Sequence, residues 1–156
     1  MSFFEWLQNT PLALLVGETW FPWVESAHVV FLAAVAGTIL TVDARLLGMG
    51  SRQLRVSYLS ERLLPWTWAA FTGAAITGLL LFMANAVSYL GKTPFLIKMC
   101  LLAVAGLNML FFQFFTWRNV ADWDSGRVAP AARAAGAISM ACWIGVIGFG
   151  RWIGFV

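Results

Sequence analysis

Charged residues are scarce in this sequence of 156 residues: they make up 11% of it, whereas 61% of it is hydrophobic. A soluble domain carries roughly 25% charged residues, so the chain lacks the polar surface that a water-facing globule needs. A helix that crosses a bilayer needs about 20 mostly apolar residues. Four such helices with short connections use up the chain, which leaves no room for a separate soluble catalytic domain.

Cysteine and histidine are scarce as well. Cys100 and Cys142 both lie in apolar runs without a CxxC pair, which argues against a disulfide framework and predicts two small buried apolar side chains. The single histidine, His28, excludes bis-histidine ligation of a haem within one chain. We expect no cleavable signal peptide, because Glu5 and Glu18 interrupt the start of the chain and no basic segment precedes an apolar core.

The apolar segments predict an all-α integral membrane four-helix bundle with a short N-terminal interfacial helix. Residues 1–19 form the interfacial segment, with a break at Thr10-Pro11, and residues 20–156 form the membrane domain. The expected spans are 23–47, 63–90, 94–117 and 130–155. We expect 48–62 to be a polar, basic loop, and Pro65 to lie in the first turn of the second helix, where its missing N–H is harmless.

Basic residues predict the orientation of these spans. They gather beside the first and third connections: Arg45, Arg52, Arg55, Arg62, Arg118, Arg127 and Arg133. The opposite side has Lys92 in its connection. The positive-inside rule therefore places both arginine-bearing connections in the cytoplasm and both termini in the periplasm of a bacterial inner membrane. Orientation signals explain the net positive charge, so we expect no nucleic-acid partner.

Small residues fill the second span, and they allow helix backbones to approach closely in lipid. They are Ala69, Ala70, Gly73, Ala74, Ala75, Thr77 and Gly78. In the third span, Asn108 is expected to anchor an interhelical hydrogen bond.

Four ionisable residues lie inside the outer ends of the spans: Glu25, His28, Lys98 and Arg151. Such residues are costly in a membrane and mark functional sites. Glu25 and His28 are three residues apart, so they share a helical face. Trp143 shares the face of Arg151. We therefore expect polar groups from three helices to meet at one depth in the outer leaflet.

Each of these side chains allows more than one role. His28 is either a neutral histidine hydrogen-bonded within the bundle or a ligand or proton-transfer group. Lys98 is expected to pair with Glu25 or to extend to the outer surface. Arg151 suits an anionic group such as a haem propionate or a lipid phosphate, or anchors the helix at the interface beside Trp152.

Further charges flank the first connection. We expect Asp43, Arg45, Glu61 and Arg62 to form an ion cluster that pins the first two helices. Asp43 also shares a face with Glu25, so a proton path between them is the alternative, although the side chains between them are apolar.

Several segments resemble known membrane families. The run Glu25-Ser26-Ala27-His28-Val29-Val30 and the run Thr77-Gly78-Leu79-Leu80-Leu81 resemble CopD-like membrane domains. A histidine in the first helix with a lysine in the third, here His28 and Lys98, is similar to HemJ-type protoporphyrinogen oxidases, four-helix proteins that bind haem b through such a histidine. Residues 20–155 are similar to an uncharacterised bacterial four-helix family of the DUF6644 type, through Leu64-Pro65-Trp66, Asn108, Trp123 and Gly150-Arg151-Trp152.

These observations leave three functions open. The first is a haem-b membrane protein in electron transfer or membrane redox chemistry. It would have His28 as the iron ligand, Lys98 or Arg151 near the propionates, and a quinone or a periplasmic redox protein as partner. The second is a copper-handling protein that binds the ion through His28, Glu25 and sulfur groups. The third is a non-catalytic membrane subunit or assembly factor. The narrow bundle also leaves room for a homo-oligomer, and whether the protein is an enzyme stays open.

Overall fold

The computed structural model describes residues 2–49, 55–123 and 128–155, which form helices and contain no strand. Four helical segments are long and apolar enough to cross a membrane: Pro11–Leu46, Val56–Ala84, Thr93–Asn119 and Pro130–Phe155. The all-α, four-span architecture predicted from composition is confirmed. The chain is a multi-pass membrane protein whose spans contact lipid.

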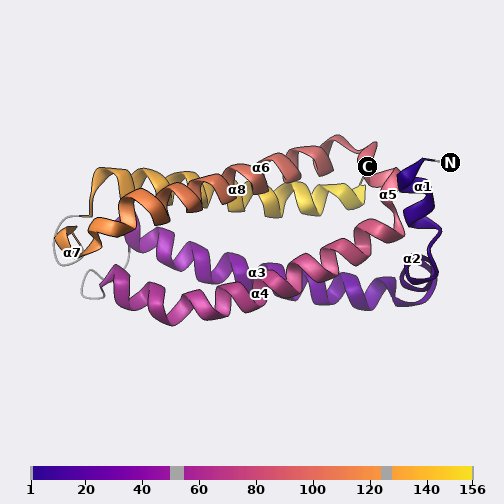
Figure 1. The fold of residues 1–156 in the computed structure, drawn as a ribbon, viewed down its shortest axis with the longest axis horizontal. Coiled ribbons are helices and arrows are strands. Elements are labelled where there is room, and N and C mark those ends of the chain that lie inside the picture. Colours follow the sequence, from indigo (N-terminus) through magenta and orange to yellow (C-terminus); the bar gives the residue numbers. More distant parts are fainter. Residues whose placement is uncertain (1, 50–54, 124–127, 156) are drawn as a thin grey trace.

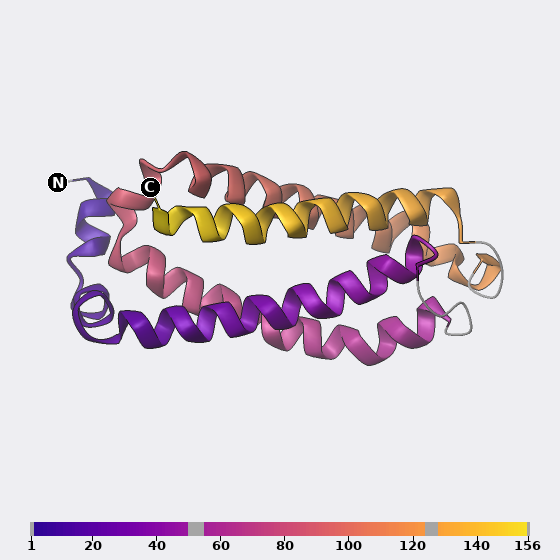
Figure 2. The ribbon, with the colours of Figure 1, turned by 180° about the vertical axis from the view of Figure 1, so that it is seen from behind.

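The spans form two antiparallel pairs. Helix α3 (Phe21–Leu46) packs along α4 (Val56–Ala84), and α6 (Thr93–Phe111) packs along α8 (Pro130–Trp152). Contact between α3 and α8 joins the two pairs. Both termini lie at one end of the bundle, and the pairs diverge toward that end (Figures 1 and 2).

The N-terminal segment lies across this end of the bundle (Figure 1). Helix α1 (Phe3–Gln8) begins with a capping box formed by Ser2 and Glu5. As predicted, the helix breaks at Thr10, whose hydroxyl caps α2 (Pro11–Leu15). A π-helical turn, Val16–Trp20, then leads into α3 without interruption. The first span therefore begins at Pro11, earlier than the expected residue 23.

The second span begins and ends at other residues than predicted. It begins at Val56, so residues predicted as a loop form its first turns and Pro65 lies inside the helix. A polar exposed face does not prevent a helix from extending beyond the hydrocarbon layer, because the helix satisfies its own backbone. The helix also ends earlier than predicted, at Ala84. Asn85, with φ −140° and ψ 37°, separates it from α5 (Ala86–Leu90).

The other connections are short. Helix α3 ends at Leu46, and Gly48, two residues further on, has a φ of 80°, a left-handed conformation that favours glycine. A π-helical turn (Phe112–Thr116), a 3-10 turn (Trp117–Asn119) and α7 (Val120–Trp123) follow α6, and a 3-10 turn (Ile153–Phe155) follows α8. Arg52 and Arg127, which contributed to the predicted orientation, lie outside the described residues.

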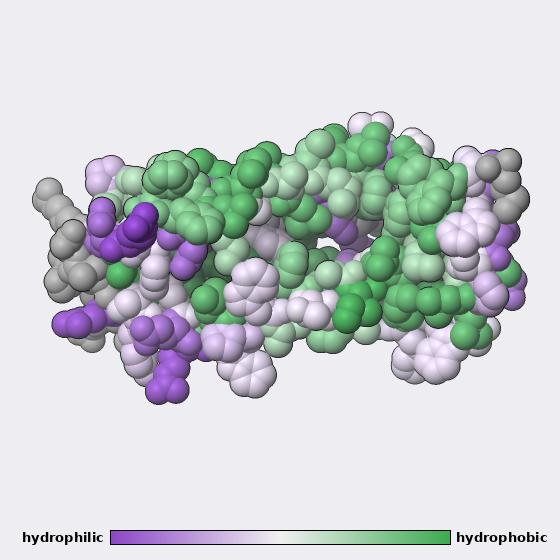
Figure 3. All heavy atoms as spheres, in the orientation of Figure 1, coloured by the Kyte–Doolittle hydropathy of each residue, from purple (hydrophilic) through white to green (hydrophobic). Residues whose placement is uncertain are grey.

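Two apolar clusters hold the bundle together. The central cluster consists of Val35, Ala70, Trp143 and Val146. The inner cluster, near the end opposite the termini, consists of Leu46, Val56, Trp123 and Ala132. Large apolar side chains elsewhere are exposed, and Figure 3 shows them as a hydrophobic surface along much of the bundle. Only the lipid-free seams between helices are packed like a protein core.

Glycines of α4 admit aromatic rings from α3. A Cβ atom at Gly73 would lie 2.7 Å from three ring atoms of Phe31. Contacts this short do not occur for real Cβ atoms, so the ring occupies the space that a side chain would take. By contrast, a Cβ at Gly106 of α6 would meet nothing within 4 Å.

Gly73→Ala should therefore weaken the α3–α4 seam by about 1–3 kcal/mol, because the added methyl group forces the Phe31 ring out of place. The measurement is the midpoint of thermal unfolding in detergent. Gly106→Ala is the matched control and should leave the midpoint unchanged or raise it slightly. Equal midpoints for the two variants would contradict the packing described for Phe31.

Candidate functional site

His28 projects from α3 toward α4 and is held there by Thr77. Its Nδ1 atom lies 2.9 Å from the Thr77 hydroxyl oxygen. That hydroxyl already donates its single proton to the carbonyl oxygens of its own helix, at 2.7 Å to Gly73 and 3.2 Å to Ala74. Thr77 must therefore accept from His28. In the neutral ring the proton is on Nδ1, and the lone pair is on Nε2.

Gly78 provides the surface on which the imidazole rests. A Cβ at this position would lie 2.9 Å from Cε1 of His28 and 3.8 Å from Nε2. The ring can approach α4 closely because residue 78 has no side chain. Thr77 fixes the tautomer and the position of Nδ1, and Gly78 leaves the room in which the ring lies against α4.

Lys98 reaches the same level from the other helix pair. It is half-buried on α6, and its side chain crosses α8, with Nζ 3.6 Å from the position of a Cβ at Gly150. The positive charge of the ammonium group lies within electrostatic range of the His28 ring. The expected meeting of the first and third helices at one depth is therefore present at His28 and Lys98.

The predicted ion pair between Glu25 and Lys98 is wrong, because no ion pair joins them in the part of the chain that the structure describes. Glu25 is exposed on α3 and lies toward Tyr89 of α5. Burial and the negative charge of Glu25 raise the pKa of the Tyr89 hydroxyl. Sharing a helical face with His28 did not bring Glu25 into the seam, since it lies nearly one turn closer to the end of the bundle.

Two further predicted site residues lie above and below this level. Arg151 is exposed on the last turn of α8, where its guanidinium lies 5.5 Å from the centroid of the Phe155 ring. Trp143 is 6% exposed and belongs to the central cluster. It lies about two turns deeper than Gly150 on α8. Arg151 therefore lies near the end of the bundle that carries the termini, and Trp143 lies deeper, in the central cluster.

An opening separates the two helix pairs in this half of the bundle. Figure 3 shows it between the α3–α4 pair and the α6–α8 pair, toward the end that carries the termini, with hydrophilic atoms at its wall. The central cluster lies deeper in the bundle, with Val35 about two turns beyond His28 on α3 and Val146 about one turn from Gly150 on α8. The arrangement is a polar opening above an apolar layer, on the side of the bundle that carries the termini.

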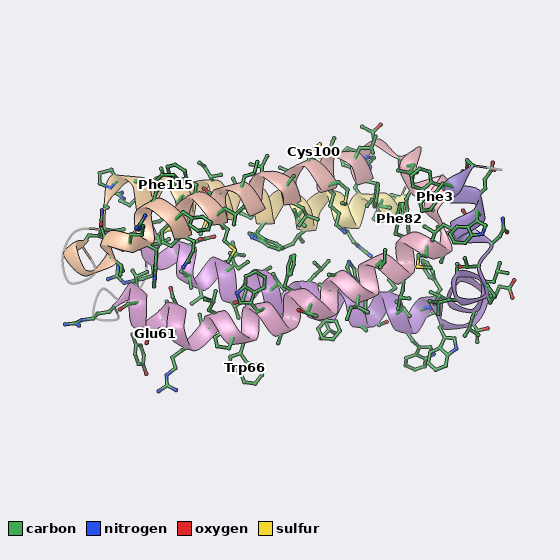
Figure 4. The ribbon with its side chains drawn as sticks, viewed as in Figure 1. Phe3, Glu61, Trp66, Phe82, Cys100 and Phe115 are labelled. Atoms are coloured by element: carbon green, nitrogen blue, oxygen red, sulfur yellow. The ribbon has the colours of Figure 1, made fainter. Side chains whose placement is uncertain are left out.

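A protein-only metal centre is not formed at this site. Within residues 2–49, 55–123 and 128–155, no group of three or more His, Cys, Asp or Glu side chains is placed to hold a metal ion. Cys142 is buried as predicted, but Cys100 is exposed and lies on the outward side of α6 (Figure 4). The expected burial of Cys100 is wrong, because an apolar run in a membrane faces lipid as well as protein.

The inner end differs from the expected ion cluster. Asp43 faces α8, where it hydrogen-bonds with Ser139. Glu61 and Arg62 are exposed on α4, and Arg62 lies 5.6 Å from the centroid of the Tyr58 ring. Asp43 therefore links α3 to α8 and not to α4, and Glu61 and Arg62 do not join it.

The sequence indicated only some of the hydrogen bonds between helices. Asn108 donates to the Ala135 carbonyl oxygen at 2.9 Å, as its mid-membrane position predicted. Thr77 and Gly78 stood out as small residues, but nothing in the sequence indicated that they hold His28. That pairing joins residues 49 positions apart, and helical periodicity carries no such information.

The family described as "Family of unknown function (DUF6644)" matches residues 3–156. No curated protein and no solved structure matches the sequence. The resemblances to CopD-like and HemJ-type proteins stay predictions. Because the match covers almost the whole chain, the protein belongs to the DUF6644 family.

Proposed function

We propose that this protein binds haem b in the opening between the helix pairs and works in electron transfer within the membrane. The observation that carries the proposal is the orientation of His28. Thr77 holds Nδ1 at 2.9 Å, which leaves the lone pair of the neutral ring on Nε2. Histidines that bind metals commonly donate their other ring N–H to a fixed acceptor in this way.

Lys98 supports an anionic ligand in the same opening. No hydrogen-bond acceptor or carboxylate of the described residues contacts its ammonium group, although the side chain is half-buried in a span. An unpaired charge at this depth is costly, and a carboxylate from a ligand would offset that cost. Haem b carries two propionates on the edge of its porphyrin ring, so Lys98 and, nearer the end of the bundle, Arg151 suit them.

When bound, the haem would supply a one-electron redox centre. The chain itself provides an oriented ligand nitrogen, a cation for the propionates and an apolar floor that includes Trp143. The opening faces the end of the bundle that carries both termini. A quinone in the outer leaflet or a periplasmic redox protein is therefore the electron partner we expect.

A non-catalytic membrane subunit or assembly factor is the second candidate function. The bond between His28 and Thr77 also ties α3 to α4, and it does so whether or not a ligand binds. Copper handling has no comparable support, because Cys100 faces away from the opening.

The basic side chains support a periplasmic location for both termini. Arg45, Arg55, Arg62, Arg118 and Arg133 lie toward the end of the bundle opposite the termini. At the termini end, Lys92 donates to the Ile153 carbonyl oxygen at 3.1 Å, which caps the last turn of α8. The charge asymmetry follows the positive-inside rule.

The purified protein should show a Soret absorption band, and His28→Ala should abolish it, because the proposed iron ligand is lost. Thr38→Val is the matched control. It removes a second hydrogen bond between α3 and α4, at 2.8 Å to Thr67, without touching the opening, so its spectrum should be unchanged. A colourless, metal-free wild-type protein after gentle extraction would refute the haem proposal and favour the non-catalytic role.

Thr77→Val should lower haem affinity by about 10–100-fold, because the imidazole loses the acceptor that fixes its tautomer and orientation. Thr77→Ser keeps the hydroxyl and should bind nearly as tightly as the wild type. Haem titration of the apoprotein, followed at the Soret band, measures both. If valine and serine variants bind equally well, Thr77 does not support the iron ligand.

Reporter fusions test the orientation. An alkaline phosphatase fused after the C-terminal residue should be active, because it folds only in the periplasm. The same reporter inserted after Met49 should be inactive. The reverse pattern would put the opening on the cytoplasmic side and exclude a periplasmic redox partner.

A further inference from the structure

A second polar site lies at the other end of the bundle, at the contact between α3 and α8. Gly136 allows these helices to approach closely. A Cβ at this position would lie 3.0 Å from the Cβ of Leu46 and 3.4 Å from the carbonyl oxygen of Asp43. One turn further along α8, Ser139 hydrogen-bonds with the Asp43 carboxyl group. The pair therefore forms because glycine lets the backbones meet.

The Asp43 carboxyl group is buried and half-satisfied. The residue is 5% exposed. Its Oδ2 atom is inaccessible to solvent and has no hydrogen-bond partner, and it is the one buried side-chain polar atom of which this is true among the described residues.

No neighbouring cation neutralises Asp43 within the described part of the chain. Arg45, two residues further along α3, is buried and engaged in an interaction of its own. On α6, the Asn108 amide is used by the Ala135 carbonyl oxygen. The other charged groups on the elements around the inner end are exposed: Arg55, Glu61 and Arg62 on α4, Arg118 after α6, and Arg133 on α8.

An ionised carboxylate in this position would keep one oxygen without a donor in an apolar environment, which costs several kcal/mol. A proton removes the charge and leaves only the smaller cost of a neutral polar group. We propose that Asp43 is a proton-binding site, which holds a carboxylic acid at neutral pH and exchanges its proton with the inner aqueous phase. The site is separate from the opening at His28 and does not depend on haem.

Infrared spectroscopy of the whole protein in a detergent without ester groups tests this directly, because lipid esters absorb in the same range as a carboxylic acid. At neutral pH the wild type should show the C=O stretching band of a protonated carboxylic acid. Asp43→Asn should remove the band, and Ser139→Ala should shift its frequency because the hydrogen bond is lost. Glu25→Gln is the matched carboxyl control and should keep the band, as should His28→Ala. A wild-type spectrum without this band, or an Asp43→Asn spectrum that retains it, would overturn the proposal.

The pH dependence of stability gives a second measurement, which also serves if Asp43→Asn does not fold. The folded protein holds this proton more firmly than the unfolded chain, in which Asp43 is exposed to water. The stabilisation that this bound proton gives the folded state is therefore present at low pH and lost as pH rises. The wild-type unfolding midpoint should fall from mildly acidic to mildly alkaline pH, and Asp43→Asn should reduce that fall. A wild-type midpoint that rises over this range would contradict a protonated Asp43.

Discussion

Hydrocarbon offers no hydrogen-bond partner, so a polar group within a span must find one inside the protein. This constraint explains most of the polar contacts in the bundle. Thr41 and Thr72 donate to carbonyl oxygens one turn earlier on their own helices. Because Thr77 does the same, its oxygen can only accept from His28. The tautomer of His28 therefore follows from the hydrogen bond that Thr77 donates to its own helix, and it does not depend on bound iron.

The same environment removes the hydrophobic driving force between helices, so that association depends on close packing. In α4, Gly73 and Gly78 accept the rings of Phe31 and His28. In α8, Gly136 lets α3 approach near Asp43. The places where helices approach most closely are therefore also the places where polar side chains contact each other. The His28 ring and the Asp43 carboxyl group each enter a seam where a glycine leaves space, and the hydrogen-bond partner of each lies within one turn of that glycine.

The sequence predicted the spans well because length and apolar content are the physical requirements for crossing a bilayer. It predicted the ends of the helices poorly. The start of α4 at Val56 was missed, since charged residues near a membrane are compatible with both a loop and a helix. At the site, depth could be counted along each helix, which correctly brought His28 and Lys98 together. The rotation of each helix about its own axis could not be derived from the sequence. Glu25 was therefore predicted to pair with Lys98, a contact that it does not make.

Among the described residues, Lys98 and Asp43 each lack a full set of polar partners, and they lie on opposite sides of the central cluster. Lys98 faces the opening, and Asp43 lies toward the end of the bundle opposite the termini. Between them, Val35, Ala70, Trp143 and Val146 form an apolar layer in which each is less than a tenth exposed. Such a layer has no donor or acceptor chain to carry a proton, so a path from Asp43 to Glu25 lacks support. A ligand at His28 would therefore enter from the end that carries the termini or from lipid, whereas a proton bound at Asp43 would exchange from the opposite end.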